Sequence, residues 1–307
     1  MTGGAGFIGS HTVEMLLERG TKVLVIDDLT HPCGVDTGAE RLAADCGSEE
    51  SARAIRDFRP NAVLHLASKG GVMRAARDPG GHVKASVASS IALFDAAVKA
   101  GARRIVTASS GGTVYGDPKV LPARETMPAA PVSAYGAGKR TEEVYLSSFR
   151  RRFGITTLAL RYGNVYGPRQ DGTGEAGLVA ISCHRLLEGR APRVFGDGGQ
   201  TRDFTYVMDV ARANVMALES RRSGEVNVGT GCETSVNQVV AILAGLAGLD
   251  GGTEREPARE GEVRRVCLDT SRARVWLDWT ADVAIATGLE HTWSWFRARR
   301  DGITTAN

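Results

Sequence analysis

The sequence predicts an α/β protein built on a doubly wound parallel sheet, and three observations support this class. Short runs rich in Val, Ile and Leu recur through the first half of the chain, at residues 22–26, 61–66, 104–107 and 156–160. Amphipathic segments lie between these runs, and the segments at 11–19 and 87–99 are each followed by a glycine where a helix end favours one. A glycine-rich motif precedes the first of these helices. Buried parallel strands joined by helices produce this pattern.

Composition narrows the function classes. The 307 residues are 42% hydrophobic and carry 38 Lys plus Arg against 35 Asp plus Glu, for a net charge of +3. This excludes a disordered chain and gives no basic field for nucleic acid. Five cysteines without CxxC spacing indicate neither a disulfide framework nor a metal knuckle. The longest apolar run, residues 239–249, is shorter than the roughly 18 residues of a membrane span, and no signal peptide is visible. We therefore expect a cytoplasmic protein without a bound metal or a membrane partner.

The glycine-rich motif predicts a Rossmann-type dinucleotide site. GxGxxG occurs at Gly4, Gly6 and Gly9 and overlaps a second pattern at Gly3, Gly6 and Gly9. Glycines at these places allow backbone N–H groups to approach a pyrophosphate at a helix N-terminus. The next predicted strand ends at Asp27, 18 residues after Gly9. An acid at this point accepts hydrogen bonds from an adenosine ribose and repels a 2′-phosphate, so NAD is the expected cofactor.

The start of the chain leaves one part of this context missing. A phosphate loop follows the central strand of its sheet, and only Met1 and Thr2 precede the loop here. An empty strand position would leave backbone groups of both neighbours without partners. We therefore expect a natural chain with about six to ten more residues, which is roughly one strand with a lead-in.

The regular alternation of predicted strands and helices ends at about residue 165, and glycine-rich loops become frequent after it. We expect an NAD-binding domain at residues 1–165 and a smaller mixed α/β substrate domain at residues 166–307, some of whose segments return to the first domain.

Tyr135 and Lys139 stand at i and i+4, which places a phenol and an ammonium on one face of a predicted helix. A nearby cation favours the phenolate and so lets a tyrosine act as a base. The alternative is a surface tyrosine beside a solvated lysine.

Motifs in this order complete a recognisable set: TGGAGFIGSH at 2–11, Asp27, HLA at 65–67, SSGGTVYG at 109–116, SAYGAGK at 133–139, LRYGNVYGPRQ at 160–170 and RDFTYVMDVA at 202–211. They resemble the extended short-chain dehydrogenase/reductase family, in its NAD-dependent epimerase/dehydratase branch, and most of all the UDP-glucose 4-epimerases within it. The resemblance implies NAD-dependent epimerisation at C4 of a UDP-sugar, such as UDP-glucose, UDP-galactose or their N-acetylated forms, through a 4-keto intermediate. It also implies a homodimer formed through the helices near 87–99 and 136–151.

The resemblance assigns catalytic roles to Tyr135 as base and to Lys139 as its partner. The family also uses a hydroxyl four residues before the tyrosine of VYG, and Gly111 stands there. Ser110 is our preferred substitute, and Ser109 and Thr113 remain open. The implied cofactor-binding residues are Gly3, Gly6, Phe7, Ile8, Gly9, Asp27, Asp45, Leu66, Ala67, Tyr135, Lys139 and Tyr162.

The resemblance implies substrate contacts at Ser110, Asn164, Arg202, Arg259, Glu262 and Val266. Guanidinium groups bind phosphate oxygens and a carboxylate can accept both hydroxyls of a ribose. The alternative for Arg202 is an ordinary surface ion pair with Asp203, and the alternative for Arg259 is a solvated residue in a segment that is charged throughout. A bulky tyrosine in relatives at the position of Val266 excludes N-acetylated sugars, so valine predicts a permissive pocket.

Besides epimerisation, the sequence leaves two alternatives: a nucleotide-sugar dehydratase or decarboxylase, and a protein that binds without catalysis. Related dehydratases carry an Asp-Glu pair where this chain has Gly112 and Thr113, and related decarboxylases tend to carry a glutamate there, which disfavours both reactions. A non-catalytic protein that binds NAD or a nucleotide sugar is the third possibility, which Tyr135 and Lys139 argue against.

Overall fold

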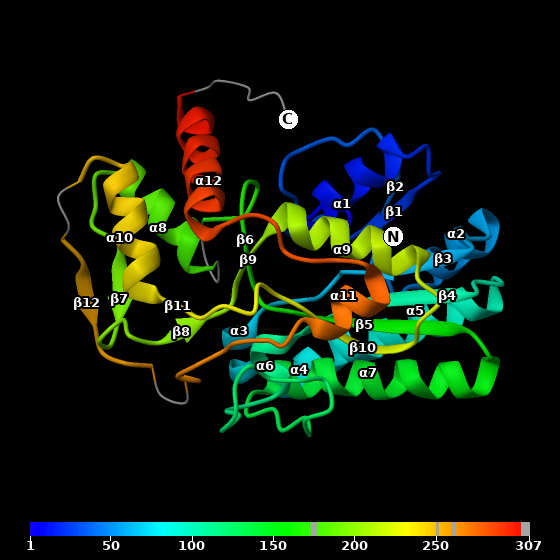
Figure 1. Ribbon diagram of the computed structural model, residues 1–307. Helices are drawn as coiled ribbons and strands as arrows, with labels where there is room; N and C mark the ends of the chain where they lie inside the picture. The colour runs from blue at the N-terminus through cyan, green and yellow to red at the C-terminus, as the bar shows by residue number, and fades with distance from the viewer. Residues whose placement is uncertain (173–176, 250–251, 260–261, 302–307) are drawn as a thin grey trace.

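The computed structural model describes residues 1–172, 177–249, 252–259 and 262–301. Its centre is a parallel sheet in which the described strands follow the order β2-β1, then Thr2, then β3-β4-β5-β10 (Figure 1). The strands are β1 Leu24–Asp27, β2 Glu40–Ala43, β3 Ala62–His65, β4 Arg104–Ser110, β5 Thr156–Tyr162 and β10 Gly224–Val228. The predicted α/β fold with a doubly wound parallel sheet is confirmed.

Thr2 joins the two parts of the sheet. It forms parallel bridges to Ile26 of β1 and His65 of β3. Its N–H donates to the Leu64 carbonyl at 3.0 Å, its carbonyl accepts from Leu66 at 3.1 Å, and the Gly3 N–H donates to the Ile26 carbonyl at 3.0 Å. The chain therefore leaves the middle of the sheet directly into the glycine-rich loop. After Thr2, the chain adds β1 and β2 on one side of it and then β3, β4, β5 and β10 on the other. This reversal creates a switch point beside the glycine-rich loop.

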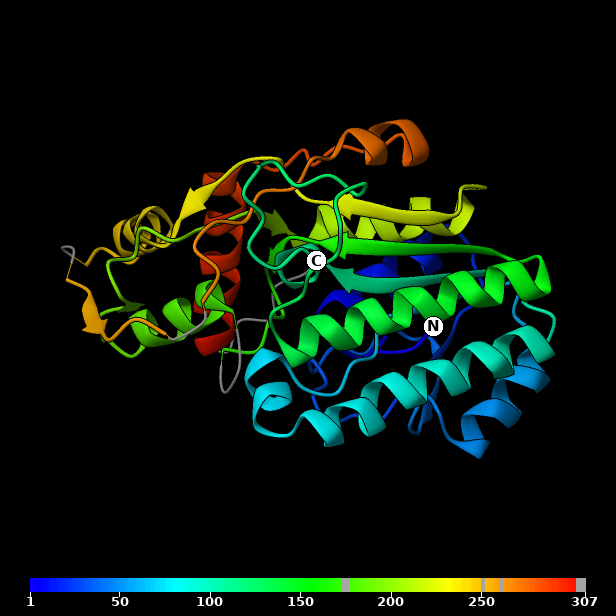
Figure 2. The same cartoon turned by 90° about the horizontal axis from the view of Figure 1, so that it is seen from below.

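Helices cover both faces of the sheet. Helices α1 (Phe7–Glu18) and α9 (Val207–Glu219) pack together on one face. Helices α2 (Glu49–Phe58), α5 (Ser89–Lys99) and α7 (Ala134–Phe153) cover the other, where α5 and α7 run side by side (Figure 2). The side chains between sheet and helices include fully buried aliphatic residues such as Ile105, Leu158 and Leu160. This burial of apolar surface fixes the strand ends that carry the site.

Several predicted boundaries differ from the structure. The first helix begins at Phe7, four residues before the predicted start, because the helix follows the glycine-rich loop without a linker. The strands β4 and β5 extend to Ser110 and Tyr162, beyond their apolar runs, because each continues its ladder with polar residues. Helix α7 begins after Ser133, whose hydroxyl accepts from the Gly136 N–H at 3.1 Å, and ends at Gly154 with φ +68°.

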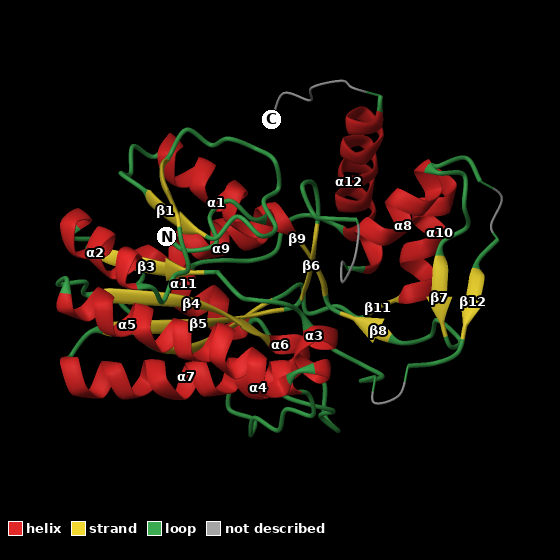
Figure 3. Cartoon of the chain, turned by 180° about the vertical axis from the view of Figure 1, so that it is seen from behind, coloured by secondary structure: helices red, strands yellow, loops and turns green. Residues whose placement is uncertain are grey.

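A second group of elements lies beyond the carboxyl ends of the strands (Figure 3). It contains three two-stranded pairings, β6 with β9, β8 with β11 and β7 with β12, and three helices that share one apolar cluster. These elements are β6 Asn164–Tyr166, β7 Arg193–Phe195, β8 Thr201–Arg202, β9 Phe204–Tyr206, β11 Thr234–Ser235, β12 Glu254–Glu256, α8 Leu178–Leu187, α10 Val236–Leu246 and α12 Ile285–Arg300.

Short helices complete the described part of the chain: α3 Val72–Arg77, α4 Pro79–His82, the π-helical segment η1 Val83–Ala88, α6 Gly111–Val114 and α11 Ser271–Leu277. Among the helices in the described ranges, none combines the length and the apolar character that crossing a membrane requires.

Candidate active site

A cavity of about 1170 Å³ opens at the carboxyl ends of β1, β3 and β4. This volume exceeds that of a pocket for a drug-sized ligand and suits a dinucleotide. All the residues predicted to bind the cofactor line it: Gly3, Gly6, Phe7, Ile8, Gly9, Asp27, Asp45, Leu66, Ala67, Tyr135, Lys139 and Tyr162. The fold therefore brings together side chains that lie up to 159 residues apart in the sequence.

The glycine-rich loop is closely packed on itself. A Cβ on Gly9 would lie 1.9 Å from the Gly3 carbonyl oxygen, and Gly3, at φ +71°, would place a Cβ 2.6 Å from the Ala67 backbone nitrogen. Gly6 faces the cavity, and a Cβ on it would have its nearest protein atom, the Gly3 carbonyl oxygen, at 3.5 Å, which is an ordinary contact. Helix α1 starts at this point without a side-chain cap or an acidic residue in its first turn. The backbone N–H groups of the first turn of α1 therefore have no side-chain partner, and together with the glycine-rich loop they form a cradle suited to a pyrophosphate.

Acidic residues and one lysine form the far end of the cavity. Asp27 accepts from the Ala5 N–H at 3.0 Å and from the Leu29 N–H at 2.9 Å, so it ties the glycine-rich loop to the end of β1. Lys69 pairs with Asp28 at 3.4 Å and also with Asp45. Burial opposes the ionisation of Asp45, but Lys69 and the Gly47 N–H outweigh it and hold the pKa of Asp45 below its usual value.

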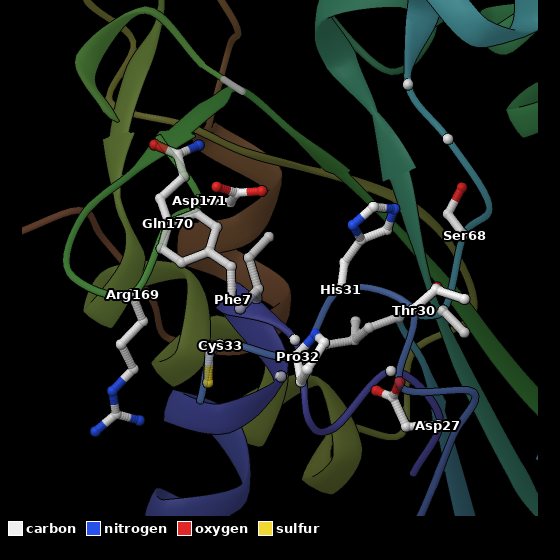
Figure 4. Close-up of a pocket in the computed structure, with 18 of the residues that line it drawn as sticks. Phe7, Asp27, Thr30, His31, Pro32, Cys33, Ser68, Arg169, Gln170 and Asp171 are labelled. Carbon is white, nitrogen blue, oxygen red and sulfur yellow. The ribbon is translucent and has the colours of Figure 1, made fainter. Parts of the chain in front are cut away.

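The loop after β1 faces a loop from the second group of elements across the cavity. Figure 4 shows Phe7 between His31 and Pro32 on one side and Arg169 and Gln170 on the other. The side chain of Gln170 donates to the Val165 carbonyl at 3.2 Å, which holds this loop against β6. Residues from both halves of the chain thus enclose the same space.

Tyr135 and Lys139 lie on the wall of the cavity formed by the first two turns of α7. The Lys139 ammonium is 5.9 Å from the centre of the Tyr135 ring, and the lysine side chain is 3% exposed. Its Nζ donates to the Glu142 carboxylate at 3.1 Å. Burial lowers the pKa of Lys139, but the charge of Glu142 together with Tyr135 more than offsets burial, so this pKa stands above its usual value. The lysine is therefore an ammonium at neutral pH.

The structure distinguishes the three candidate hydroxyls. Ser109 lines the cavity, but its Oγ donates to Glu143 at 2.7 Å and supports a buried ion pair. Ser110 is half-buried at the start of α6 and does not line the cavity. Thr113 Oγ1 is buried and has no hydrogen-bond partner among the described residues. The Thr113 carbonyl would lie 2.7 Å from a Cβ on Gly136, so α6 adjoins the turn of α7 that carries Tyr135. Ser110 remains our prediction, with Thr113 as its closest competitor.

The predicted substrate residues Asn164, Arg202, Arg259, Glu262 and Val266 are absent from the described lining of the cavity. Arg202 Nη2 instead donates to Glu262 at 2.6 Å, so these two are brought together. Arg259 stacks on the Phe195 ring at 3.9 Å. Val266 is buried in a tightly packed region that also contains Gly111 and Tyr115.

The segment that carries Val266 runs beside the strand that carries Arg202. The Val266 N–H donates to the Thr201 carbonyl at 3.2 Å, and Thr201 forms a parallel bridge to Arg265. Asn164 is exposed, and its Oδ1 would lie 3.5 Å from a Cβ on Gly112, next to Ser110. These residues form a second region close to α6.

The sequence analysis missed three residues beside the cavity. Lys69 lines it, Glu142 contacts Lys139, and the His82 ring packs against the Tyr135 ring at 5.9 Å. Glu142 follows Lys139 by three residues on α7, a spacing that places neighbours on one helix face and could have indicated this contact. The contacts of Lys69 with Asp28 and Asp45 join distant segments and have no such signal in the sequence. In the described residues no group of three or more His, Cys, Asp or Glu is arranged to hold a metal.

Comparison with known proteins identifies the family. The model of the NAD dependent epimerase/dehydratase family matches residues 1–229. The chain belongs to this family. A UDP-glucose 4-epimerase of Mycolicibacterium smegmatis is 41% identical over 305 residues, covering 97% of each chain. This epimerase/dehydratase family member also resembles solved structures closely. The UDP-glucose 4-epimerase of Thermotoga maritima with UDP-glucose has a TM-score of 0.94 at 40% identity, covering 97% of this chain and 98% of that one. The Thermus thermophilus UDP-glucose 4-epimerase in complex with NAD has a TM-score of 0.91 at 39% identity, covering 96% and 97%.

Proposed function

We propose that this protein is an NAD-dependent isomerase that epimerises C4 of a UDP-sugar. The observation that carries the proposal is the position of Tyr135 and Lys139 on the wall of a cavity that begins at the glycine-rich loop. The named relatives, which are UDP-glucose 4-epimerases at about 40% identity, support the same reaction. UDP-glucose and UDP-galactose are the substrates we propose first, and their N-acetylated forms second.

The residues of the cavity fit NAD. The uncapped start of α1 can bind the pyrophosphate, and Asp27 at the end of β1 is placed to accept from a ribose. Leu66 and Ala67 add apolar surface at the end of β3. When bound, NAD would supply a reversible acceptor for the hydride that leaves C4 as the hydroxyl loses its proton.

We propose that Tyr135 removes the proton from the sugar 4-hydroxyl and returns it after the 4-keto sugar has turned. Lys139 stabilises the phenolate that forms and holds the cofactor ribose, because its ammonium has three N–H donors and Glu142 accepts only one of them. A hydroxyl from Ser110 or Thr113 donates to the reacting oxygen. Each proton taken is returned, so the cycle needs no external acid or base.

The region beyond α6 supplies the nucleotide-sugar contacts in this proposal. Arg202 binds the diphosphate, Glu262 and Arg259 flank the ribose and phosphate, and Asn164 lies beside the sugar. The Arg202–Glu262 pair would then open when the substrate enters. We propose in the same way that residues 1–165 bind the cofactor and residues 166–307 the substrate, although β10 belongs to the central sheet.

A dehydratase or decarboxylase is the competing reaction. Its acidic pair has no counterpart in α6, where Gly112 and Thr113 occupy the two positions. The Thr113 hydroxyl can donate to an oxygen, but it cannot act as a carboxylate base. Epimerisation is therefore the reaction that the site chemistry favours.

An NMR time course tests the proposal. Purified protein with NAD and no reductant is given UDP-hexoses, UDP-N-acetylhexosamines and UDP-glucuronate in separate reactions. We expect the C4 epimer of at least one sugar. A 4-keto-6-deoxy sugar or a pentose product would replace the proposal by a dehydratase or decarboxylase. NAD binding without conversion of any sugar would leave a non-catalytic binding protein.

We also propose a homodimer formed through α5 and α7. Val144 and Tyr145 on the outer face of α7 are 52% and 43% exposed, and Val83, shortly before α5, is 52% exposed. Exposed apolar side chains on α7 and on η1, the segment that leads into α5, suit contact with a second copy. Light scattering of wild type and of Val144→Glu tests this, because a charge at that contact should give monomers.

The free cysteines fit a reducing compartment, so the cytoplasm is the location we propose.

A further inference from the structure

A chain of buried polar groups lies behind Lys139, on the side away from the cavity. Glu142 accepts from Lys139 Nζ at 3.1 Å and from Ser90 Oγ at 3.3 Å. Ser90 Oγ in turn lies 2.8 Å from His65 Nε2, and His65 Nδ1 lies 2.7 Å from Thr2 Oγ1. These side chains come from α7, α5, β3 and the start of the chain, and all of them are buried.

Glu142 is 2% exposed and is absent from the described lining of the cavity, whereas Lys139 lines it. One N–H of the ammonium is directed backward to the carboxylate, and two remain for the cavity side. Ser90 Oγ lies 3.3 Å from the second carboxylate oxygen and 2.8 Å from the Ser86 carbonyl, so its one hydrogen is shared between these two acceptors. A buried carboxylate held in this way has little freedom to move, so it fixes both the charge and the direction of the lysine head.

The other titratable groups around Lys139 do not supply this charge. Burial raises the pKa of the Cys46 thiol to about 12, and burial lowers the pKa of His65 to about 3, so both are neutral at pH 7. His82 packs its ring against Tyr135, whose ring is 5.9 Å from the ammonium. Among the described residues, Glu142 is the carboxylate in hydrogen-bond contact with Lys139.

We propose that Glu142 is a positioning residue that keeps Lys139 protonated and directs its free N–H groups into the cavity. The assignment rests on the function proposed above, because Lys139 acts there as an ammonium. Without Glu142 the lysine would be a buried cation without a counter-charge, and burial strongly favours the neutral amine.

The next residue provides a matched control. Glu143 is as buried as Glu142, but it has different partners: it forms a bidentate pair with Arg161 at 2.8 Å and accepts from Ser109. Glu143→Gln therefore removes a buried carboxylate from the same helix turn without touching Lys139. A general loss of stability would affect both variants, whereas a change at Lys139 should follow Glu142 alone.

The test is a ¹³C NMR titration of biosynthetically labelled lysine in the full-length protein. The chain has six lysines, and the signal lost in Lys139→Arg assigns this one. We expect wild-type Lys139 to titrate at or above the ordinary value of about 10.4. In Glu142→Gln its pKa should fall by about one to three pH units, and in Glu143→Gln by less than about 0.5. Glu142→Asp keeps the charge at a longer distance and should give an intermediate value.

The titration separates this assignment from the proposed reaction, since it is recorded without substrate. A folded Glu142→Gln protein with an unchanged Lys139 titration would overturn the assignment. If that variant does not fold, a wild-type Lys139 that titrates well below 10.4, or an unshifted value in Glu142→Asp, would overturn it equally. If the wild type is active, the loss of activity that accompanies deprotonation of Lys139 as pH rises should begin at a lower pH in Glu142→Gln than in wild type. Failure of wild type to convert any UDP-sugar would instead contradict the proposed reaction and leave the titration result as it is.

Discussion

The two halves of the proposed site are built from different parts of the chain. The cofactor half consists largely of backbone and short side chains at strand ends, such as Gly3, Gly6 and Ala67, and all its predicted residues line one cavity. The substrate half consists of long side chains on loops and short strands, such as Arg202 and Glu262, which bind each other. Strand ends are fixed by the fold, whereas paired loop side chains must exchange partners when a ligand binds. The first half should therefore be rigid before binding and the second should reorganise.

The largest effect should come from the point where the halves meet. Tyr135→Phe removes the proposed base and leaves the ring that packs on His82. We expect kcat to fall by about 10²- to 10⁴-fold with NAD affinity almost unchanged. Tyr145→Phe on the exposed face of the same helix is the control and should behave as wild type. Nearly full activity of Tyr135→Phe would remove the base from this residue and with it the proposed mechanism.

Two glycine substitutions test the rigidity of the cofactor half. Gly9→Ala places a Cβ 1.9 Å from the Gly3 oxygen, so it should lower the free energy of unfolding by about 1–3 kcal/mol or more, measured by chemical denaturation. Gly6 has φ −82° and room for a Cβ among the protein atoms, so Gly6→Ala should leave stability unchanged. Its methyl group would stand where a pyrophosphate approaches, and NAD affinity by calorimetry should fall about tenfold or more. Unchanged NAD binding by Gly6→Ala would place the cofactor elsewhere.

The same contrast explains what the sequence could predict. The strands, the glycine-rich loop and Asp27 follow from local patterns whose spatial outcome is fixed by the parallel sheet, so their meeting at one cavity was predictable. Lys69 acts through contacts with Asp28 and Asp45, which are distant in sequence, and no periodicity specifies such contacts. The i,i+3 spacing of Lys139 and Glu142 did carry a signal, but it did not show that both side chains are buried. Helix α1 begins earlier than predicted because its first turn is also the glycine-rich loop. The arrangement of Arg259 and Phe195 depends on loop packing, for which one sequence holds no signal.

Arg202 tests the proposed reorganisation of the substrate half. Arg202→Gln removes the guanidinium that would leave Glu262 for the diphosphate. We expect KM for the UDP-sugar to rise about 10- to 100-fold while kcat changes little, because a charge-assisted contact to phosphate contributes about 1.5–3 kcal/mol. Arg264, which pairs with Asp197 at 2.7 Å on the surface, is the matched control, and Arg264→Gln should leave KM unchanged. Equal effects of both variants would show that Arg202 only forms a surface ion pair.

Val266 should give the smallest effect and tests whether the substrate half also selects the sugar. Its side chain is 5% exposed beside Gly111, near the proposed hydroxyl donors but outside the described lining of the large cavity. Val266→Tyr should reduce kcat/KM for a UDP-N-acetylhexosamine about tenfold relative to the matching UDP-hexose, since a bulky ring would occupy the space of the acetyl group. Overpacking should also lower stability by about 1–3 kcal/mol, so the ratio of the two substrates is the quantity to measure. Val275→Tyr at an exposed position is the control for the added ring. An equal loss on both sugars would mean that Val266 contributes to packing alone, and that selection by size occurs elsewhere in the substrate half.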